Sequence, residues 1–151
     1  NKLEHDARVI AKTMNATDPN LAEFRAKGGK LLMFTGWSDM AISPLGTIAY
    51  YEDVISNDPK AADDVKLFMM PGVGHCLGGD GPSWVNWIDE LDQWVRGEEA
   101  PEQVTVYFVD EQFQPSGSQL LCAYPEVAVY DGKGDPKDVA SFSCGQIEYN
   151  E

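Results

Sequence analysis

Two short apolar runs stand out in the pattern of hydrophobic and polar positions along the chain. Residues 30–35 and 65–70 are nearly continuous apolar runs, which is typical of strands buried on both faces of a parallel sheet. A third strand-like run covers residues 104–109. Each of the first two runs leads into a loop and then into helical periodicity. The pattern predicts parallel strand–loop–helix units, and therefore the α/β fold class.

Four segments are expected to be helical. Residues 3–14 place apolar side chains at helical spacing, and residues 19–27 predict a short second helix that ends at a Gly-Gly pair. Pro44 can open the third helix, because the first helical turn does not use the N–H that proline lacks. The fourth helix is predicted within residues 84–96. One face of it would carry six apolar residues, which we interpret as core contacts and not as a ligand platform: Trp84, Trp87, Ile88, Leu91, Trp94 and Val95.

The character of the chain changes after residue 110, where Gln, Pro, Ser and Gly become common. We interpret residues 1–110 as part of a catalytic domain and residues 111–151 as a C-terminal tail that folds back on the same domain. A bridge between Cys122 and Cys144 would staple this tail. It would close a loop of about 22 residues and contribute about 3 kcal/mol under the chain-entropy account.

Composition and charge narrow the classes of partner and compartment. The 151 residues, 43% of them hydrophobic, suffice for one domain with a core. A net charge of −14 argues against nucleic acid and anionic membranes as partners, and no apolar run reaches the ~20 residues of a membrane span. The first residues lack a signal-peptide pattern, so any targeting segment is expected outside them. Asn15-Ala16-Thr17 fits a glycosylation acceptor, which favours a secreted or periplasmic protein.

Candidate chemistry gathers in the loops that follow the two apolar runs. Asp39 follows the first run and His75 follows the second. An acid that precedes a histidine by one strand–helix unit is the order of an α/β-hydrolase triad after its nucleophile. Two other interpretations remain open from the pattern alone. His75 can bond a backbone carbonyl, and Asp39 can cap the helix that begins near Pro44.

Other site chemistries fit the sequence less well. A metal site built from Asp39, His75, Cys76 and Asp80 lacks the closely paired ligands usual for zinc, so we expect no metal in this chain. No serine lies in a Gly-x-Ser-x-Gly elbow, and Ser116-Gly117-Ser118 in the tail is a poor candidate nucleophile. Cys76 is also disfavoured as the nucleophile, because neighbours on an extended segment point in different directions.

Several motifs together resemble the C-terminal part of the tannase and feruloyl esterase family. The most specific is the Gly-x-Gly-His-Cys run at residues 72–76, and the resemblance covers residues 15–110 best. The other matching elements are Gly28-Gly29-Lys30-Leu31-Leu32, Gly36-Trp37-Ser38-Asp39, Gly46-Thr47, Tyr50-Tyr51, Gly78-Gly79 and Ala100-Pro101. The tail with Cys122 and Cys144 is similar to that of several secreted members.

The resemblance implies the C-terminal half of an α/β-hydrolase sheet, with Asp39 as triad acid and His75 as triad base. It also implies that Cys76 pairs with a cysteine directly before the nucleophilic serine, which would account for the odd count of three cysteines. Members of the family carry a lid domain, often with a structural calcium. Neither the serine elbow nor the lid lies in these residues, so we expect the isolated chain to be inactive.

The complete enzyme is therefore expected to hydrolyse aromatic carboxylic esters, such as feruloyl or galloyl esters. Its N-terminal part would supply the serine and the lid and would be joined to this chain through Cys76. The chain could be one product of processing or the C-terminal fragment of a longer protein. We also keep an alternative of another class: a non-catalytic subunit or degenerate domain that only binds a partner.

Overall fold

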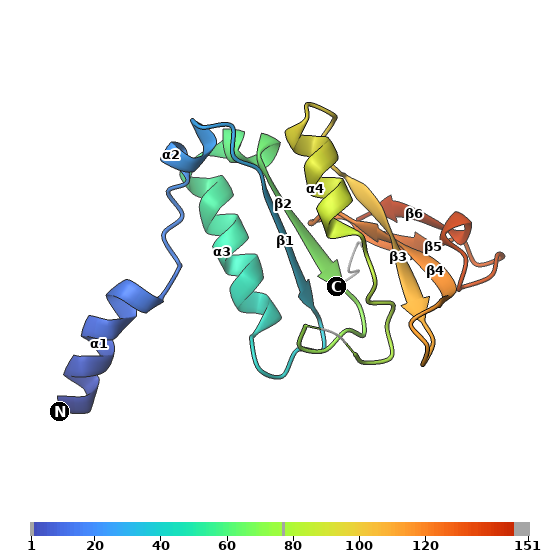
Figure 1. The fold of residues 1–151 in the computed structure, drawn as a ribbon, viewed down its shortest axis with the longest axis horizontal. Coiled ribbons are helices and arrows are strands. Elements are labelled where there is room, and N and C mark those ends of the chain that lie inside the picture. The colour runs from blue at the N-terminus through green and yellow to red at the C-terminus, as the bar shows by residue number, and fades with distance from the viewer. Residues whose placement is uncertain (1, 77, 147–151) are drawn as a thin grey trace, which may run out of the picture.

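The computed structural model describes residues 2–76 and 78–146. Helices and strands alternate along the first part of the chain, and the C-terminal region consists mainly of strands (Figure 1). The elements are α1 (Lys2–Met14), α2 (Ala22–Arg25), β1 (Leu31–Gly36), α3 (Pro44–Asn57), the 3-10 helix η1 (Pro59–Asp63), β2 (Val65–Met70), α4 (Trp87–Val95), β3 (Gln103–Val109), β4 (Pro115–Cys122), β5 (Val127–Tyr130), the 3-10 helix η2 (Val139–Ser141) and β6 (Phe142–Gly145).

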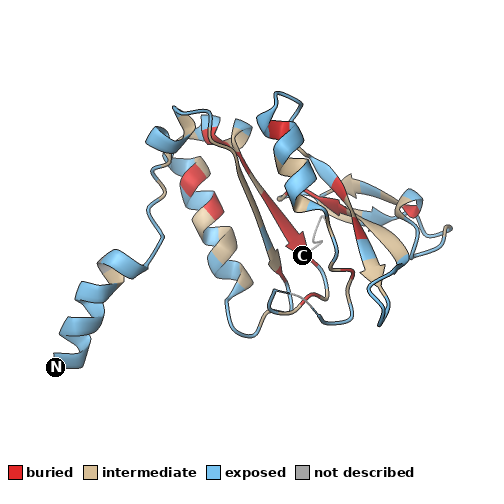
Figure 2. Cartoon of the chain, viewed as in Figure 1, coloured by how far each residue is buried: buried red, intermediate tan, exposed pale blue. Residues whose placement is uncertain are grey.

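Strands β1 and β2 pair in parallel, in a register that joins Leu31 to Val65 and Gly36 to Met70. Successive side chains of a strand point to opposite faces, and both faces of β2 are buried. Val65, Leu67 and Met69 pack in one apolar cluster with Tyr51 and Val54 of α3. On the other face, Phe68 and Met70 pack with Val104, Val106, Leu121 and Ala123 of the C-terminal region. The predicted parallel pair is therefore confirmed, and β2 is its buried strand (Figure 2).

Strand β1 is less buried than its apolar sequence predicts. Only Gly36 is fully buried in it, and 45% of Phe34 is exposed. Within the described residues β1 pairs with β2 alone, so the other edge of β1 has no neighbouring strand there. The prediction of a strand buried on both faces is thus right for β2 and wrong for β1.

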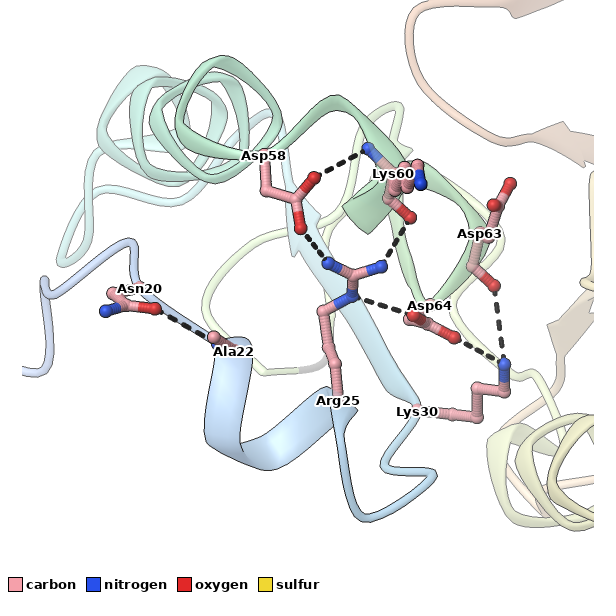
Figure 3. A network of polar contacts seen from close by, with 8 residues as sticks. All are labelled: Asn20, Ala22, Arg25, Lys30, Asp58, Lys60, Asp63 and Asp64. Carbon is pink, nitrogen blue, oxygen red and sulfur yellow. Dashed lines mark hydrogen bonds and ion pairs between the residues drawn. The ribbon is translucent and has the colours of Figure 1, made fainter.

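An ionic network fixes the starts of the two parallel strands (Figure 3). Arg25 of α2 forms ion pairs with Asp58 and Asp64, and its Nη2 donates to the carbonyl of Lys60 at 2.7 Å. Lys30 Nζ lies 2.6 Å from the second oxygen of Asp64. The backbone N–H of Leu31 donates to the carbonyl of Asp64 at 2.9 Å. These bonds set the strand register at the end opposite the two candidate catalytic loops.

The C-terminal region forms antiparallel pairs and not a further parallel unit. β3 pairs antiparallel with β4, and β5 pairs antiparallel with β6. The strand-like run at 104–109 forms β3, but it does not extend the parallel pair, because a short hairpin and not a helical crossover joins β3 to β4. The predicted boundary at 110/111 falls in this hairpin. The division into domain and tail stays a prediction.

The region after residue 122 nevertheless packs on the parallel pair. Ala123 forms an antiparallel bridge with Phe68 of β2, and the N–H of Tyr124 donates to the carbonyl of Leu67 at 2.8 Å. The structure also contains the Cys122–Cys144 disulfide that we anticipated. It joins the end of β4 to β6, so the last strand pair is covalently fixed to the β3–β4 hairpin.

The fourth predicted helix differs from the observed one in where it begins and in which side chains it buries. Helix α4 begins at Trp87, while Trp84 forms a backbone bridge with Tyr107 of β3 and is 49% exposed. Trp94 is buried as expected, but Ile88 and Val95 are 75% and 57% exposed. The predicted six-residue apolar face is therefore wrong at Trp84, Ile88 and Val95.

The N-terminal helix α1 matches its predicted span of 3–14 and lies apart from the sheet (Figure 1). The described side chains of its apolar stripe are largely uncovered, with Leu3 79% and Met14 74% exposed (Figure 2). Among the helices within residues 2–76 and 78–146, none is both long and apolar enough to cross a bilayer.

Candidate active site

The loops after β1 and β2 are held together by backbone contacts. The N–H groups of Trp37 and Ser38 donate to the carbonyls of Met70 and Val73 at 3.0 and 2.9 Å. A Cβ on Gly36 would lie only 2.2 Å from the Val73 carbonyl oxygen. Because only glycine lacks that carbon, Gly36 allows the two loops to approach this closely. The parallel register then carries both loops to the same edge of the sheet.

The carboxylate of Asp39 is fixed by three hydrogen bonds. Its Oδ1 accepts the N–H groups of Ala41 at 2.8 Å and Ile42 at 2.9 Å, and its Oδ2 lies 2.9 Å from His75 Nδ1. The hydrogen bond from Ile42 and then the one from His75 lower the pKa of Asp39 below its ordinary value. The carboxylate is thereby kept ionised and oriented toward the imidazole.

The alternative roles left open by the sequence are not the observed ones. The N-cap of α3 is Ser43, so Asp39 closes a local turn before the helix and does not cap it. The other interpretation of His75 was a hydrogen bond to a backbone carbonyl, whereas in the structure His75 contacts the carboxylate of Asp39. The structure therefore brings together the two residues predicted as acid and base, while their catalytic roles stay a prediction.

The loop of His75 is a tight bend closed by glycines. Val73 forms an antiparallel bridge with Gly79, and the N–H of Gly74 donates to the carbonyl of Gly78 at 2.8 Å. A Cβ on Gly79 would lie 2.1 Å from the carbonyl oxygen of Gly72, and the φ of Gly79 is +96°. The bend leaves 55% of the His75 side chain exposed, while the Asp39 side chain is only 7% exposed.

Asp39 and His75 line a hollow of about 230 Å³, which we call the Asp39–His75 hollow. Small-molecule sites usually measure about 300–1,000 Å³, so this hollow is small for a complete site. Most of its remaining wall is apolar, with polar Thr35 and Thr47 beside the acid. Neither this wall nor the amide donors of Ala41 and Ile42 were predicted from the sequence. An Asp side chain often accepts hydrogen bonds from the backbone N–H groups two and three residues later. The spacing of Asp39, Ala41 and Ile42 fits this turn and could have indicated those donors.

Two other residues singled out in the sequence are Cys76 and Asn15. Cys76 is the exposed free cysteine and lines the same hollow. Its φ of +61° shows that the segment is not extended there, so the directional argument against Cys76 as nucleophile does not hold. Asn15 is exposed just after α1. Its glycosylation stays a prediction.

The sequence also raised two further sets of residues, the candidate metal ligands and the tail serines. Residues 2–76 and 78–146 contain no group of three or more His, Cys, Asp or Glu side chains arranged to hold a metal ion. Ser118 lies in β4, where its Oγ accepts the N–H of Val139 at 3.1 Å. This bond gives Ser118 a structural role within the C-terminal strands.

Comparison with known proteins assigns the chain to a family. Residues 1–145 match the sequence profile described as tannase and feruloyl esterase. The chain belongs to this family. It is also 38% identical over 131 residues to the mono(2-hydroxyethyl) terephthalate hydrolase of Piscinibacter sakaiensis, a match that covers 85% of the chain and 22% of that relative.

Two solved structures share the fold of the chain. An esterase from Aspergillus oryzae superposes with a TM-score of 0.77 at 26% identity, over 85% of this chain and 30% of that one. Feruloyl esterase B from Aspergillus oryzae gives a TM-score of 0.74 at 26% identity, over 85% and 29%. The resemblance found in the sequence motifs is therefore confirmed. The chain spans only about a fifth to a third of the length of these proteins.

Proposed function

We propose that this chain supplies the acid and the base of a Ser-His-Asp triad in a carboxylic ester hydrolase. The observation that carries the proposal is the 2.9 Å contact between Asp39 Oδ2 and His75 Nδ1. One partner is nearly buried and the other is open to a hollow. A buried carboxylate that orients an accessible imidazole is the arrangement that general-base catalysis requires. Family membership supports the same chemistry.

The hydrogen bond to Asp39 determines which nitrogen of His75 acts as the base. With Nδ1–H donated to the carboxylate, Nε2 carries the free lone pair. Nε2 takes the proton of a serine hydroxyl as its oxygen attacks the ester carbonyl. The same proton then passes to the departing alcohol and leaves an acyl-serine. Water, deprotonated by Nε2, hydrolyses that intermediate, and the proton returns to the serine.

The serine, the oxyanion hole and the lid are proposed to come from an N-terminal part of the same enzyme. Three features support a missing partner: the small hollow, the unpaired edge of β1 and the exposed Cys76. On this proposal the chain is the C-terminal half of an α/β-hydrolase sheet. A disulfide through Cys76 would hold serine and histidine in register, where small misplacements cost rate steeply. Any calcium would belong to the lid.

We further propose that the substrates are esters of aromatic acids. The hollow beside His75 has the side chains of Phe34, Ile42 and Met70 in its wall, which suit an aromatic acyl group. The named activities of the relatives, feruloyl ester and terephthalate ester hydrolysis, support this class. The Cys122–Cys144 disulfide fits an oxidising compartment, so the enzyme is proposed to be secreted or periplasmic.

The test replaces His75 in the complete enzyme that carries this chain. His75→Ala should reduce hydrolysis of a methyl hydroxycinnamate by at least about 10³-fold, because a triad loses most of its rate when its base is removed. His5→Ala is the matched control, since His5 lies exposed on α1 and should leave the rate unchanged. Retention of more than a tenth of the activity by His75→Ala, with an unchanged circular dichroism spectrum, would refute the proposal.

A further inference from the structure

A second hollow lies at the tip of the β3–β4 hairpin. This tip is at the same end of the molecule as the loops that follow β1 and β2 (Figure 1). It measures about 410 Å³, within the range usual for small-molecule sites. We call it the hairpin hollow. Its walls carry the aromatic rings of Trp84, Phe108 and Phe113 and the polar groups of Asp80, Ser116 and Lys137.

The hairpin hollow neighbours the Asp39–His75 hollow through a small intermediate one of about 160 Å³. The intermediate hollow shares Phe34 and Cys76 with the Asp39–His75 hollow, and it shares Ser83 and Trp84 with the hairpin hollow. Phe34 and Trp87, which both line the intermediate hollow, stack with ring centroids 4.8 Å apart. The hairpin hollow is therefore a separate site beside the proposed reaction centre and not an extension of the hollow that contains His75.

The aromatic rings of the hairpin hollow are exposed on a fixed backbone. Trp84 is 49% exposed and Phe113 is 68% exposed. Trp84 and Tyr107 exchange two backbone hydrogen bonds at 3.1 and 2.9 Å, which hold Trp84 on the edge of β3. Phe113 is held in the hairpin turn, where its N–H donates to the carbonyl of Asp110 at 3.0 Å. Because the backbone that carries each ring is already held, only the side-chain torsions remain to be ordered when a flat ligand binds.

Backbone irregularities also gather around this hollow. Phe113 has a φ of +57°, a left-handed conformation that costs energy for an aromatic residue and is often found at ligand sites. The β3–β4 register shifts between Phe108 and Val109, and the residue left unpaired in β4 is Ser116. Bulges of this kind often redirect a side chain beside a functional site. Both irregularities occur at residues that line the hollow.

The polar groups of the hollow define the chemistry of its ligand. Lys137 is anchored to β4 through its carbonyl, which accepts the N–H of Ser118 at 2.7 Å, and its Nζ lies 5.2 Å from the Phe108 ring centroid. Asp80 offers acceptors, Lys137 offers donors and Ser116 offers both. A phenolic hydroxyl can donate to the carboxylate and accept from the ammonium. A ligand with a net charge of either sign would be repelled by one of these two groups.

We propose that the hairpin hollow binds a hydroxylated aromatic ring, stacked between Trp84 and Phe113. It would serve as a second ring site for substrates that carry several phenolic rings and would hold one ring while another is presented to His75. This role in substrate binding rests on the proposed esterase function. The binding of the ring itself does not depend on the esterase function.

The probe is catechol, titrated into the enzyme that carries this chain while the indole N–H resonances are followed by NMR. We expect the Trp84 resonance to shift and saturate. Phe113→Ala, followed at the Trp84 resonance, should weaken catechol binding from about twofold to about tenfold, the usual contribution of one aromatic contact. Trp84→Ala lacks that resonance and should show the same loss when binding is measured by isothermal titration calorimetry. Trp37→Ala is the matched control, because Trp37 is 44% exposed and does not line this hollow. His75→Ala should bind catechol as the wild type does.

Three outcomes would overturn the inference. Catechol could leave the Trp84 resonance unmoved, benzene could bind as tightly as catechol, or glucose could bind more tightly and reveal a carbohydrate site. If the proposed esterase function is wrong, a different result follows, because His75→Ala would then hydrolyse the ester at an unchanged rate. Phe113→Ala should raise KM for an ester with a second phenolic ring more than it raises KM for a single-ring methyl ester.

Discussion

At the scale of single residues, Asp39 illustrates how a local turn can prepare a catalytic group. One carboxylate oxygen is used by two backbone N–H groups of its own loop, and the other is left for His75. The turn therefore fixes the direction of the carboxylate before the histidine is considered. The same bonds keep its pKa low, so the acid stays charged in the acidic range where many carboxylates begin to protonate.

Asp39→Asn should keep the fold and lower kcat of the complete enzyme by about 10²–10⁴-fold. An amide in this place cannot stabilise the imidazolium that forms during the reaction, and it favours the wrong histidine tautomer. The measurement is steady-state hydrolysis of an aromatic methyl ester near neutral pH. Asp53→Asn, an exposed carboxylate on α3, is the control. A less than twofold change in Asp39→Asn would mean that the 2.9 Å contact is structural only.

Asp64 gives a prediction about stability and pH. Burial is the largest influence and raises the pKa of Asp64, but the hydrogen bonds from Lys30 and Arg25 outweigh it and leave the pKa lowered. A carboxyl group with a lower pKa in the folded state stabilises the fold above its unfolded pKa of about 3.9. That stabilisation is lost as pH falls through the folded-state pKa.

Asp64→Asn should therefore reduce the free energy of unfolding by about 1–3 kcal/mol at pH 7. The difference from wild type should shrink as the pH falls below 4. Urea unfolding at pH 7, 5 and 3 measures this. Asp63→Asn, the exposed neighbour in the same turn, should change the stability little at any pH. A wild-type advantage that grows on acidification would contradict the ion-pair account.

At the scale of elements, the site depends on how two loops meet after a parallel strand pair. The register of β1 and β2 is fixed at one end by the Arg25 network (Figure 3) and at the other by the close approach at Gly36. Between these ends, the core of β2 prevents sliding, because Leu67 and Phe68 are completely buried on opposite faces. The alignment of acid and base is thus a property of the strand pair.

Gly36→Ala tests this dependence. Its added Cβ would overlap the Val73 carbonyl oxygen, so we expect a loss of about 1–3 kcal/mol in stability and a fall in kcat as the loops separate. Gly46→Ala in α3 is the matched control. The nearest atom to its Cβ would be 3.9 Å away, so alanine should stabilise the helix by up to about 1 kcal/mol. Equal effects of the two substitutions would exclude the steric explanation.

At the scale of the whole molecule, the chain has a core but several uncovered apolar surfaces. Beside the site, Met40, Ile42 and Leu45 are 100%, 57% and 65% exposed, and α1 carries a further uncovered stripe (Figure 2). Exposed apolar side chains that cluster around a site often mark an interface. These surfaces agree with the proposal that a second part of the enzyme covers the reaction centre.

The intact mass of the native enzyme, with and without reductant, tests the proposed link through Cys76. If Cys76 joins two chains, the native species should be larger than 16.6 kDa and should release this chain on reduction. If both parts belong to one continuous chain, peptide mapping should instead find Cys76 disulfide-linked to a peptide with a Cys-Ser pair. A free Cys76 thiol in the active enzyme would contradict both arrangements.

The sequence by itself determined the local elements, the candidate pair and the family. Apolar runs and turn residues act over a few positions, so β1, β2, α3 and the loops of Asp39 and His75 could be predicted. Only the tertiary structure decided which elements meet. Trp84 lies at the edge of β3 and not in the predicted helix, Val104–Val109 pairs antiparallel, and β1 is only partly buried. These features depend on non-local pairing and burial, and local patterns do not specify the neighbours involved. The hairpin hollow likewise combines residues more than fifty positions apart, which only the folded chain brings together.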